Sequence, residues 1–484
     1  MESVEIAPLE TERFERVLGS DRYRAFARSM EKAVDCFGDR VLWCVNSAAK
    51  GGGVAELLSS MMGYLSGVGI DARWAVIEGD EDFFALTKRI HNRLHGDEGD
   101  GGPLGPEERE IYERVLRADT DELAKTVGRG DMVIVHDPQP AGLIPAVAEA
   151  GATVVWRCHI GVDHPNDVAR RGWEFLLPYV TVAEVAVFSR QAYAWPGLDR
   201  VEIVPPSIDA FSPKNQDLDR ARVDAILAAA GIQDGEPGTG AEFVRRDGSH
   251  ARVQRKARLI EEEPLSASAP VVVQVSRWDR LKDPAGVIEG FAGHVPEPTG
   301  AHLMLAGPWI DGVADDPEAG EVLAEVEAAW RALPSETRSR VHLASLPAED
   351  DDENSAMVNA LQRRAQVVVQ KSLAEGFGLT VAEAMWKERP VVASRVGGIQ
   401  DQIIHGESGL LVDDPEDLES FGRAVAGLLG DPEGAERIGR AARRRVCDEF
   451  LATSHLERWL ALLSRAAAPN RSRRSSPSAA GSNR

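Results

Sequence analysis

Several features that mark other classes of protein are missing from this sequence. Cysteine is scarce, with 4 residues in 484 and no CxxC pair, which favours a reducing compartment over a disulfide framework. No apolar run approaches the ~20 residues that a membrane span requires. The first residues, MESVEIAPLETERFERV, contain no basic segment followed by an apolar one, so they do not resemble a secretory signal. We therefore expect a cytoplasmic protein that makes no contact with a membrane.

Basic charge is also in deficit, because 55 Lys and Arg stand against 78 Asp and Glu, a formal net charge of −23. Proteins that bind nucleic acid broadly present basic surface to phosphate, so this balance argues against nucleic acid as a partner. It leaves room for a local phosphate site built from a few cations. The acidic run 349–353 is explained by solubility alone.

What the chain does contain is an alternation of Val-rich apolar runs and amphipathic stretches. Near-continuous apolar runs are typical of buried parallel strands, whereas half-exposed strands alternate apolar and polar residues. Between the runs, the apolar residues of segments such as 54–65 follow one face of a helix. The pattern predicts an α/β fold with doubly wound parallel sheets. The expected strands are 41–46, 132–137, 153–160, 271–276, 302–307, 367–372 and 391–394.

A polar, Gly-rich stretch from 212 to 266 interrupts this alternation once and divides the chain into two α/β halves of similar size. Within it, Asp247-Gly248 suggests a short hairpin, with a disordered loop as an equal alternative. A Ser- and Arg-rich tail without acidic residues is expected to be disordered. The predicted organisation is a first domain over 1–212, a linker or insertion over 213–265, a second domain over 266–450, a C-terminal helix over 451–466 that can pack on the first domain, and a tail over 467–484.

Two such domains would leave a cleft between the carboxyl ends of two sheets. Ligands of open α/β sheets bind at those ends, so the chemistry should lie in loops that directly follow strands. In the first half, Gly52 and Gly53 lie between a strand and a helix, where backbone N–H groups can approach an anion. The loop is neither a Walker A motif nor GxGxxG, and a tight turn is its structural alternative.

Histidines follow the next two expected strands of the first half. His136 opens the stretch HDPQP, which also contains Asp137 and Gln139, and His159 ends the stretch WRCH. A single histidine at such a place is usually structural, but two in one domain favour polar ligand recognition. Their spacing indicates no metal site.

In the second half, two cations follow a strand. Arg277 and Lys282 lie in the stretch SRWDRLKD, and in an acidic chain they form a compact cationic loop. An arginine grips a phosphate with two parallel hydrogen bonds, whereas a lysine acts as a point charge. The alternative is a solvated surface loop.

The stretch 370–385 is the most informative. A strand leads into a Gly-Phe-Gly loop at 376–378 that opens a helix, with carboxylates at Glu375 and Glu383. N–H groups at the start of that helix can bind a diphosphate. Glu383 lies about two turns into the helix, ~8 Å further along, which suits a ribose. Glu375 would meet the group beyond the phosphates, since sugar hydroxyls are the natural partners of carboxylates beside a phosphate.

The motif Glu375-x7-Glu383 with Gly-Phe-Gly-Leu-Thr between resembles the signature of the retaining glycosyltransferases of family 4. These have the GT-B fold, in which two Rossmann-like domains face a central cleft. Within the family the match is closer to the trehalose-forming synthases, and it spans roughly residues 40–450. One departure is Gly161, where relatives often have Asp. The supporting stretches are 52–56, 72–79, 136–140, 156–160, 205–209 and 384–387.

The resemblance implies transfer of glucose from a nucleoside diphosphate glucose, ADP- or UDP-glucose, to glucose, which gives α,α-trehalose with retention. Arg277 and Lys282 would neutralise the departing diphosphate. Glu375 would hold the donor glucose, Glu383 the ribose, and His159 the sugar near its 6-hydroxyl. These roles make Arg277, Lys282, Glu375 and His159 the catalytic candidates.

The resemblance also implies the remaining contacts. The donor site would comprise Gly52, Gly53, Arg277, Lys282, Glu375, Gly376, Phe377, Gly378, Leu379, Thr380 and Glu383. The acceptor candidates are Asp137 and Gln139. The cations make a metal cofactor unnecessary, although Mg²⁺ can accompany the nucleotide, and a homodimer is a family-level expectation.

Three other interpretations stay open. A retaining trehalose phosphorylase would use the same parts with inorganic phosphate, and Glu383 would then lack a ribose. A family 4 enzyme with another acceptor, such as a sugar phosphate, would need extra cations in the first domain, where Lys50, Arg157 and Arg170-Arg171 are the candidates. The intact set of cations and carboxylates weighs against a non-catalytic nucleotide-sugar sensor.

Overall fold

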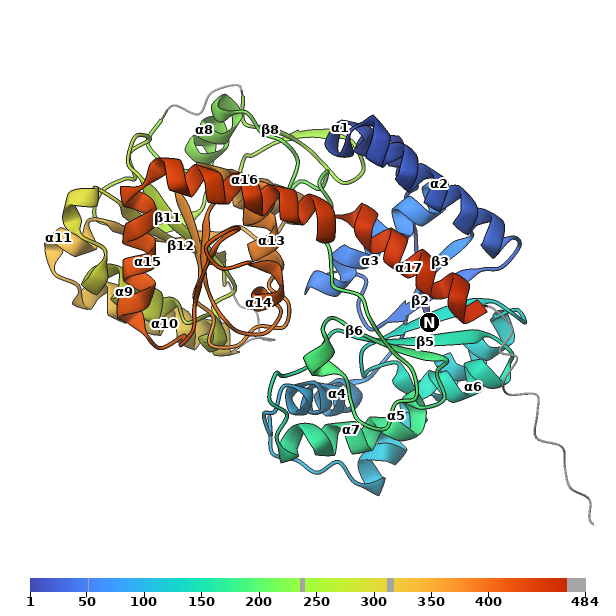
Figure 1. Cartoon of the computed structure of the whole chain (residues 1–484). Coiled ribbons are helices and arrows are strands. Elements are labelled where there is room, and N and C mark those ends of the chain that lie inside the picture. Colours follow the sequence, from blue (N-terminus) through green and yellow to red (C-terminus); the bar gives the residue numbers. More distant parts are fainter. Residues whose placement is uncertain (51, 236–239, 311–316, 468–484) are drawn as a thin grey trace, which may run out of the picture. The chain divides into compact units, whose positions relative to one another are not determined.

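The computed structural model describes residues 1–50, 52–235, 240–310 and 317–467, and these form two units (Figure 1). Unit 1 contains residues 1–161 and 165–204 and the described residues from Leu456 onward. Unit 2 contains residues 162–164 and 205–455. Within the described residues, each unit is built on one seven-stranded sheet.

The sheet of unit 1 has the strand order β1-β3-β2-β4-β5-β6-β7. All neighbours are parallel except β1 and β3. The register pairs Leu42 with Met132 and Met132 with Thr153, so the central strands begin level with one another. The strands are β1 Glu2–Val4, β2 Leu42–Asn46, β3 Ala72–Val76, β4 Met132–His136, β5 Thr153–Cys158, β6 Val185–Phe188 and β7 Val201–Ile203.

Helices connect these strands and bury their apolar faces against the sheet. A core that includes Trp156, Phe188 and Tyr112 lies between the sheet and helices α4, α5 and α7. The helices are α1 Glu15–Leu18, α2 Ser20–Phe37, α3 Gly52–Gly67, α4 Glu81–Leu94, α5 Pro106–Thr126, α6 Ile144–Glu149 and α7 Asp167–Val180, with 3₁₀ helices at Thr11–Phe14, Ala141–Leu143 and Gln191–Tyr193.

The sheet of unit 2 has the order β10-β13-β12-β11-β14-β15-β16 and is parallel except for the pair β10 and β13. A separate two-stranded sheet joins β8 and β9. The strands are β8 Glu242–Val244, β9 His250–Arg252, β10 Arg258–Ile260, β11 Val271–Val275, β12 His302–Pro308, β13 Val341–Leu346, β14 Val367–Gln370, β15 Val391–Ser394 and β16 Leu410–Val412.

The helices of unit 2 cover its sheet and extend to the end of the described chain. They are α8 Arg220–Ala229, α9 Pro284–His294, α10 Pro317–Ala332, α11 Ser335–Arg338, α12 Asp351–Arg364, α13 Leu379–Trp386, α14 Ile399–Gln402, α15 Leu418–Gly430, α16 Pro432–Glu449 and α17 Ala452–Ala467, with 3₁₀ helices at Arg280–Lys282 and Glu297–Thr299. The last part of α17 belongs to unit 1, where the guanidinium of Arg465 lies 3.1 Å from the carboxylate of Glu202.

The α/β fold predicted from the sequence is confirmed, and each expected Val-rich run is a parallel strand. Several runs leave the sheet one or two residues early. β4 ends at His136 and β14 at Gln370, because the polar residues after them turn into loops. Cys44 and Cys158 are fully buried among apolar neighbours, as expected for small apolar side chains in strands.

Much of the segment 213–265 is a folded part of unit 2. It contains α8, the antiparallel pair β8–β9 that forms the hairpin at Asp247-Gly248, and β10, which pairs with β13. Residues 236–239 lie outside the described residues, as do residues 468–484 of the expected tail. Unit 2 begins at Pro205, before the boundary expected at 212.

The acidic run 349–353 has a structural role, so the explanation by solubility alone is wrong. Arg245 forms two parallel hydrogen bonds to Asp350, with N···O distances of 2.9 and 2.6 Å. Arg246 lies 3.1 Å from the carboxylate of Asp352. The run therefore ties the β8–β9 hairpin to the start of α12. A planar guanidinium facing a carboxylate in this way gives a geometrically specific contact.

Candidate active site

Most of the sequence-predicted residues lie where the strand order of each sheet reverses, and His159 follows the neighbouring strand β5. In unit 2 the order reverses between β11 and β14, and in unit 1 between β2 and β4. At such a point the two loops after neighbouring strands diverge and leave a crevice at the carboxyl edge. Lys282 and Glu375 follow β11 and β14, and Gly52 and Asp137 follow β2 and β4. Strand order alone therefore marks these four loops as candidate ligand sites.

Lys282 and Glu375 form an ion pair at the switch point of unit 2. The ammonium Nζ lies 2.6 Å from the carboxylate Oε2, and the side chains are 15% and 13% exposed. Ser372 donates a hydrogen bond from Oγ to the same oxygen at 3.2 Å. The structure thus brings together two residues that lie far apart in the sequence and that the sequence assigned to one site.

The turn that carries Lys282 is fixed to the loop after β14. The N–H of Leu373 donates to the carbonyl of Leu281 at 2.8 Å, and Gln274 Nε2 donates to the carbonyl of Lys282 at 3.0 Å. The ammonium of Lys371, whose side chain is only 2% exposed, pairs with the carboxylate of Asp283. Two neighbouring loops are therefore held together beside the Lys282–Glu375 pair.

Asp283 has an unusual backbone conformation that helps to end this turn. Its φ is 46°, in the left-handed region that is uncommon for residues other than glycine. Its carboxylate also accepts a hydrogen bond from the N–H of Gly286 at 3.1 Å and so caps α9. Because the same carboxylate pairs with Lys371, one side chain fixes both the helix start and the turn.

Arg277 is placed differently from its expected partner. Its side chain is 69% exposed and pairs with Asp279 at 3.0 Å, whereas Lys282 is largely enclosed. Asp279 in turn accepts a hydrogen bond from the N–H of Leu281 at 2.8 Å. The two cations of the predicted cationic loop are therefore both paired with carboxylates but differ in exposure, since Lys282 is largely enclosed and Arg277 is mostly exposed.

In the Gly-Phe-Gly loop, the backbone is the part suited to bind a ligand, whereas the side chain of Phe377 makes a packing contact. Gly378 has φ 83° and directly precedes α13, which begins at Leu379. The ring of Phe377 packs edge-on against Phe450, with ring centroids 5.7 Å apart. Thr380 Oγ1 donates to Gln370 Oε1 at 3.0 Å. These contacts fix the loop and leave the helix start, with its N–H groups, as the feature suited to an anion.

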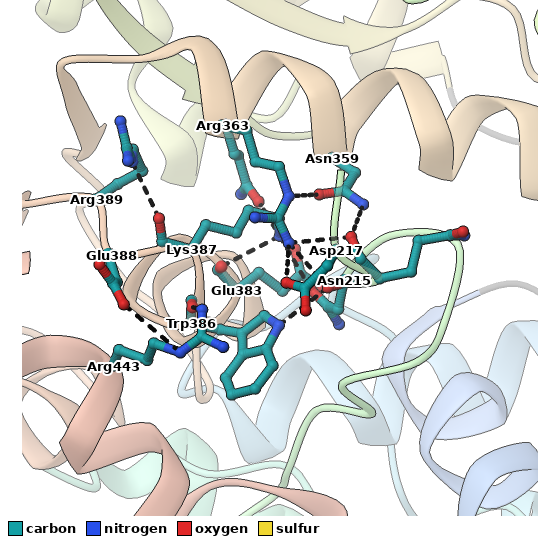
Figure 2. Close-up of polar contacts among 12 residues, drawn as sticks. Asn215, Asp217, Asn359, Arg363, Glu383, Trp386, Lys387, Glu388, Arg389 and Arg443 are labelled. Atoms are coloured by element: carbon teal, nitrogen blue, oxygen red, sulfur yellow. Dashed lines mark hydrogen bonds and ion pairs between the residues drawn. The ribbon is translucent and has the colours of Figure 1, made fainter. Parts of the chain in front are cut away.

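Glu383 lies on α13 and is buried, with only 3% of its side chain exposed. Its Oε1 is 3.6 Å from Nζ of Lys214, and its backbone carbonyl accepts from Nζ of Lys387 at 3.1 Å. Figure 2 shows Glu383 within a polar cluster that includes Asn215 and Lys387. Within the described residues, Oε2 of Glu383 has no hydrogen-bond partner.

In unit 1, Asp137 and His159 meet at the ends of β4 and β5. The backbone N–H of His159 donates to Oδ1 of Asp137 at 2.7 Å, and the indole N–H of Trp156 donates to the carbonyl of Asp137 at 3.1 Å. Asp137 has φ 66°, so its backbone is strained, and the residue is partly buried. Burial raises the pKa of Asp137 to about 7, against the opposing effects of the His159 N–H and of Arg157.

The two histidines and Arg157 form the rest of this edge. Nδ1 of His136 lies 3.2 Å from Nε2 of His159, and the rings are stacked with centroids 5.5 Å apart. Arg157 is fully buried and donates to Oγ of Ser189 at 3.1 Å. Burial lowers the pKa of Arg157 to about 10, and the nearby Asp137 acts in the opposite direction.

The other unit 1 candidates are more loosely connected. Gly52 begins α3 with φ 74°, a conformation that favours glycine, while Gly51 lies outside the described residues. Oε1 of Gln139 is buried and has no hydrogen-bond partner within the described residues. Gly161 is required by packing, because a Cβ there would lie 2.3 Å from Cγ of Tyr193.

Sequence reasoning missed three residues beside the predicted ones: Lys214, Lys371 and Asp283. Lys371 directly follows an apolar strand. A cation in that place, at the carboxyl edge of the sheet, is the signal in the sequence that could have identified it. Lys214 lies in a polar segment without periodicity, and nothing in its local sequence points to α13. Within the described residues, no group of three or more His, Cys, Asp or Glu side chains is arranged to hold a metal ion. Nor does any helix there have the length and apolar character needed to cross a membrane.

Comparisons with known proteins agree with this geometry. Residues 256–445 match the family model described as glycosyl transferases group 1. The solved structure of the α,α-trehalose 6-phosphate synthase from Burkholderia multivorans superposes with a TM-score of 0.64 at 17% identity, covering 89% of this chain and 97% of that one. Two Rossmann-like units with candidate sites at their carboxyl edges define a glycosyltransferase with the GT-B fold.

The first unit narrows the assignment, since residues 44–195 match the family model for the N-terminal domain of trehalose synthase. Trehalose synthase from Pyrococcus horikoshii is 35% identical over 421 residues, 87% of this chain and 88% of that protein. Trehalose synthase from Rubrobacter xylanophilus is 34% identical over 89% of this chain and 91% of that protein. The chain belongs to the trehalose synthase family, and it is an enzyme of trehalose-related glycosyl transfer.

Proposed function

We propose that this protein transfers glucose from a nucleoside diphosphate glucose, ADP- or UDP-glucose, to glucose and forms α,α-trehalose with retention of configuration. The observation that carries the proposal is the Lys282–Glu375 ion pair at the switch point of unit 2, directly before the N-terminus of α13. A cation, a carboxylate and a helix start in one crevice suit a sugar joined to a diphosphate.

The leaving diphosphate is the group on which negative charge develops. Lys282 would neutralise it together with the N–H groups at the start of α13, and Arg277 would add a second, more exposed cation. An ammonium has three N–H donors, so Lys282 can bind a phosphate oxygen and still keep its contact with Glu375. The cation therefore needs little reorientation when the donor arrives.

The carboxylates would recognise hydroxyl groups on the donor. Glu375 would accept hydrogen bonds from the glucose, and Glu383 from the ribose, because acceptor-only carboxylates fit hydroxyl donors. The buried oxygen of Glu383 that lacks a hydrogen-bond partner within the described residues supports this assignment, since a buried carboxylate oxygen is costly without a donor.

In unit 1, we assign His159 to the donor sugar and Asp137 and Gln139 to the acceptor glucose. The hydrogen bond from the His159 N–H to Asp137 fixes these two residues relative to each other. We infer no covalent intermediate of the two-carboxylate type. The acceptor hydroxyl would attack from the face that the diphosphate leaves, and the leaving phosphate would take its proton.

The test is direct incubation of the full chain with glucose and each nucleoside diphosphate glucose in turn. We expect one non-reducing disaccharide with both anomeric carbons in the α configuration, identified by NMR, and one released diphosphate per disaccharide. Lys282→Ala serves as the control for background hydrolysis. Absence of disaccharide with every donor would refute the proposal, and glucose 1-phosphate formed from trehalose and inorganic phosphate would identify a phosphorylase instead.

A further inference from the structure

The carboxylate of Glu383 has a cation beside one oxygen and no hydrogen-bond partner within the described residues for the other. Oε1 lies 3.6 Å from Nζ of Lys214, a distance that makes an ion pair but is too long for a hydrogen bond. Oε2 is buried without a hydrogen-bond donor among the residues described. A buried carboxylate needs both opposite charge and donors. The positive charge of Lys214 therefore lies near the carboxylate, but within the described residues no hydrogen-bond donor reaches Oε2.

Lys214 comes from the segment 213–217, which α12 holds by its backbone. Asn359 Nδ2 donates to the carbonyl of Pro213 at 3.1 Å and to that of Gln216 at 2.9 Å. Arg363 donates to the carbonyl of Gln216 at 3.0 Å. Figure 2 shows Asn359 and Arg363 on one side of this segment.

The same segment is fixed from α13, the helix that carries Glu383. The indole N–H of Trp386 donates to the carbonyl of Asn215 at 2.9 Å. Nζ of Lys387 donates to Oδ1 of Asn215 at 3.0 Å and to the carbonyl of Glu383 at 3.1 Å (Figure 2). These contacts use backbone carbonyls and the side chain of Asn215. The position of Lys214 is therefore set by its neighbours, and its ammonium lies beside Glu383.

We propose that Lys214 is a positioning residue of the donor site, which holds the charge and orientation of Glu383 so that Oε2 accepts hydroxyl groups of the ribose. This inference rests on the proposed function, because the ribose belongs to the nucleotide donor. Its consequence is selectivity. The protein should discriminate between nucleoside diphosphates that carry the ribose hydroxyls and those that lack them, and Lys214 should be needed for that discrimination.

A purely structural role for Lys214 predicts different binding results. If Lys214 only stabilised unit 2, its loss would weaken every ligand alike and would do so whether or not residue 383 carries a charge. If it acts through Glu383, its loss should affect only ligands with a ribose and only when Glu383 is ionised. The two roles can therefore be separated by choice of ligand and by a second substitution.

The experiment is isothermal titration calorimetry on the full chain with ADP, UDP, their 2′,3′-dideoxy counterparts and pyrophosphate. We expect Lys214→Met to weaken ADP or UDP binding about tenfold, the typical effect of losing a hydrogen bond to a charged group, here the bond from the ribose to Glu383. Binding of the dideoxy nucleotides and of pyrophosphate should not change. Lys214→Arg, which keeps the charge, should stay within about threefold of the unmodified protein.

Two controls complete the design. In a Glu383→Gln background, Lys214→Met should cause no further loss of nucleotide affinity, because the carboxylate it serves is absent. Lys256→Met, at an exposed lysine of the same unit, should bind like the unmodified protein. If Lys214→Met fails to fold in thermal unfolding, Lys214→Gln serves for the same comparison.

Three results would overturn the inference: unchanged nucleotide affinity in Lys214→Met, an equal loss for pyrophosphate, or an equal loss in the Glu383→Gln background. The last two would show a structural role. Failure of the unmodified protein to bind any nucleotide is a different outcome, since it would refute the nucleotide donor itself. The inference and the proposed function therefore fail in recognisably different ways.

Discussion

Replacing Lys371 by methionine should both destabilise unit 2 and slow the reaction. Lys371 is buried at the carboxyl end of β14, and its ammonium pairs with Asp283, the residue after Lys282. Methionine has a similar length but no charge, so the substitution leaves the carboxylate of Asp283 without its cation. The turn that carries Lys282 then loses one of its ties to the loop after β14.

The size of the effect follows from the burial of the two partners. Removing one member of a fully buried pair costs about 3–5 kcal/mol, because the other charge is left uncompensated. The side chain of Asp283 is 20% exposed, so water offsets part of that cost. We therefore expect a loss of about 2–3 kcal/mol in the free energy of unfolding. A displaced Lys282 should lower kcat by about 10–10².

The assay is urea unfolding followed by tryptophan fluorescence, with turnover measured on the same preparations. The matched control is the double variant Lys371→Met with Asp283→Asn, which removes both charges. Asparagine can still cap α9 and tolerates the φ of 46° at this position. The double variant should therefore recover more than half of the lost stability.

Either of two results would refute this reasoning. One is a Lys371→Met protein that unfolds at the same urea concentration as the unmodified protein. The other is a double variant as unstable as Lys371→Met alone, which would mean that the loss comes from packing and not from an unpaired carboxylate. Full stability with reduced kcat would also contradict the argument, since loss of the ion pair is expected to lower both the free energy of unfolding and kcat.

Three further predictions concern single residues. Lys282→Ala or Arg277→Ala should lower kcat by about 10²–10³ at saturating donor, far more than Glu383→Ala changes the KM for the acceptor, and wild-type turnover in either cationic variant would contradict the leaving-group role. Gly161→Ala should lower the free energy of unfolding by about 1–3 kcal/mol, because its Cβ would lie 2.3 Å from Cγ and 2.6 Å from Cβ of Tyr193; adding Tyr193→Gly, which removes both atoms, should relieve the clash, and an equally stable Gly161→Ala protein would exclude it. Because the pKa of Asp137 is raised from 3.8 to about 7 in the folded protein, its contribution to stability should fall as pH rises from 4 to 7; urea unfolding across that range should show a flatter profile for Asp137→Asn, and an unchanged profile would count against the raised pKa.

The fold and the placement of the candidate residues at the carboxyl edges of the sheets could be predicted because both depend on local pattern. A strand buried on both faces must be apolar along its length, so runs such as 271–276 and 367–372 can be recognised as strands from the sequence alone. Polar residues that follow such a run must lie at the carboxyl edge of a parallel sheet. Lys282 and Glu375 were found in this way, and the structure places them in contact.

Other features depend on contacts that no local pattern reveals. Strands such as β10 and β16 have three residues each, too short to show periodicity. Lys371 and Asp283 are 88 positions apart in the sequence, and their pairing exists only because β11 and β14 are neighbours in the sheet. The polar residues of the segment 213–265 show no apolar face and so predict a linker, although three of its arginines pair with carboxylates of 350–353.

If unit 2 binds the diphosphate of the donor as we propose, the ion pairs around β11 and β14 also explain how an acidic chain holds such a site before the ligand arrives. An enclosed cation without a partner would be costly, and Lys282 avoids that cost through Glu375, as Lys371 does through Asp283. The pairs keep the site close to neutral, so they do not attract a diphosphate by net charge. What they provide is preorganisation, because the ammonium of Lys282 is already held in place beside the start of α13. Under the proposed function, selectivity then comes from the hydroxyl groups whose hydrogen bonds the carboxylates accept, so that the sugar, and not the phosphate alone, is the recognised part of the donor.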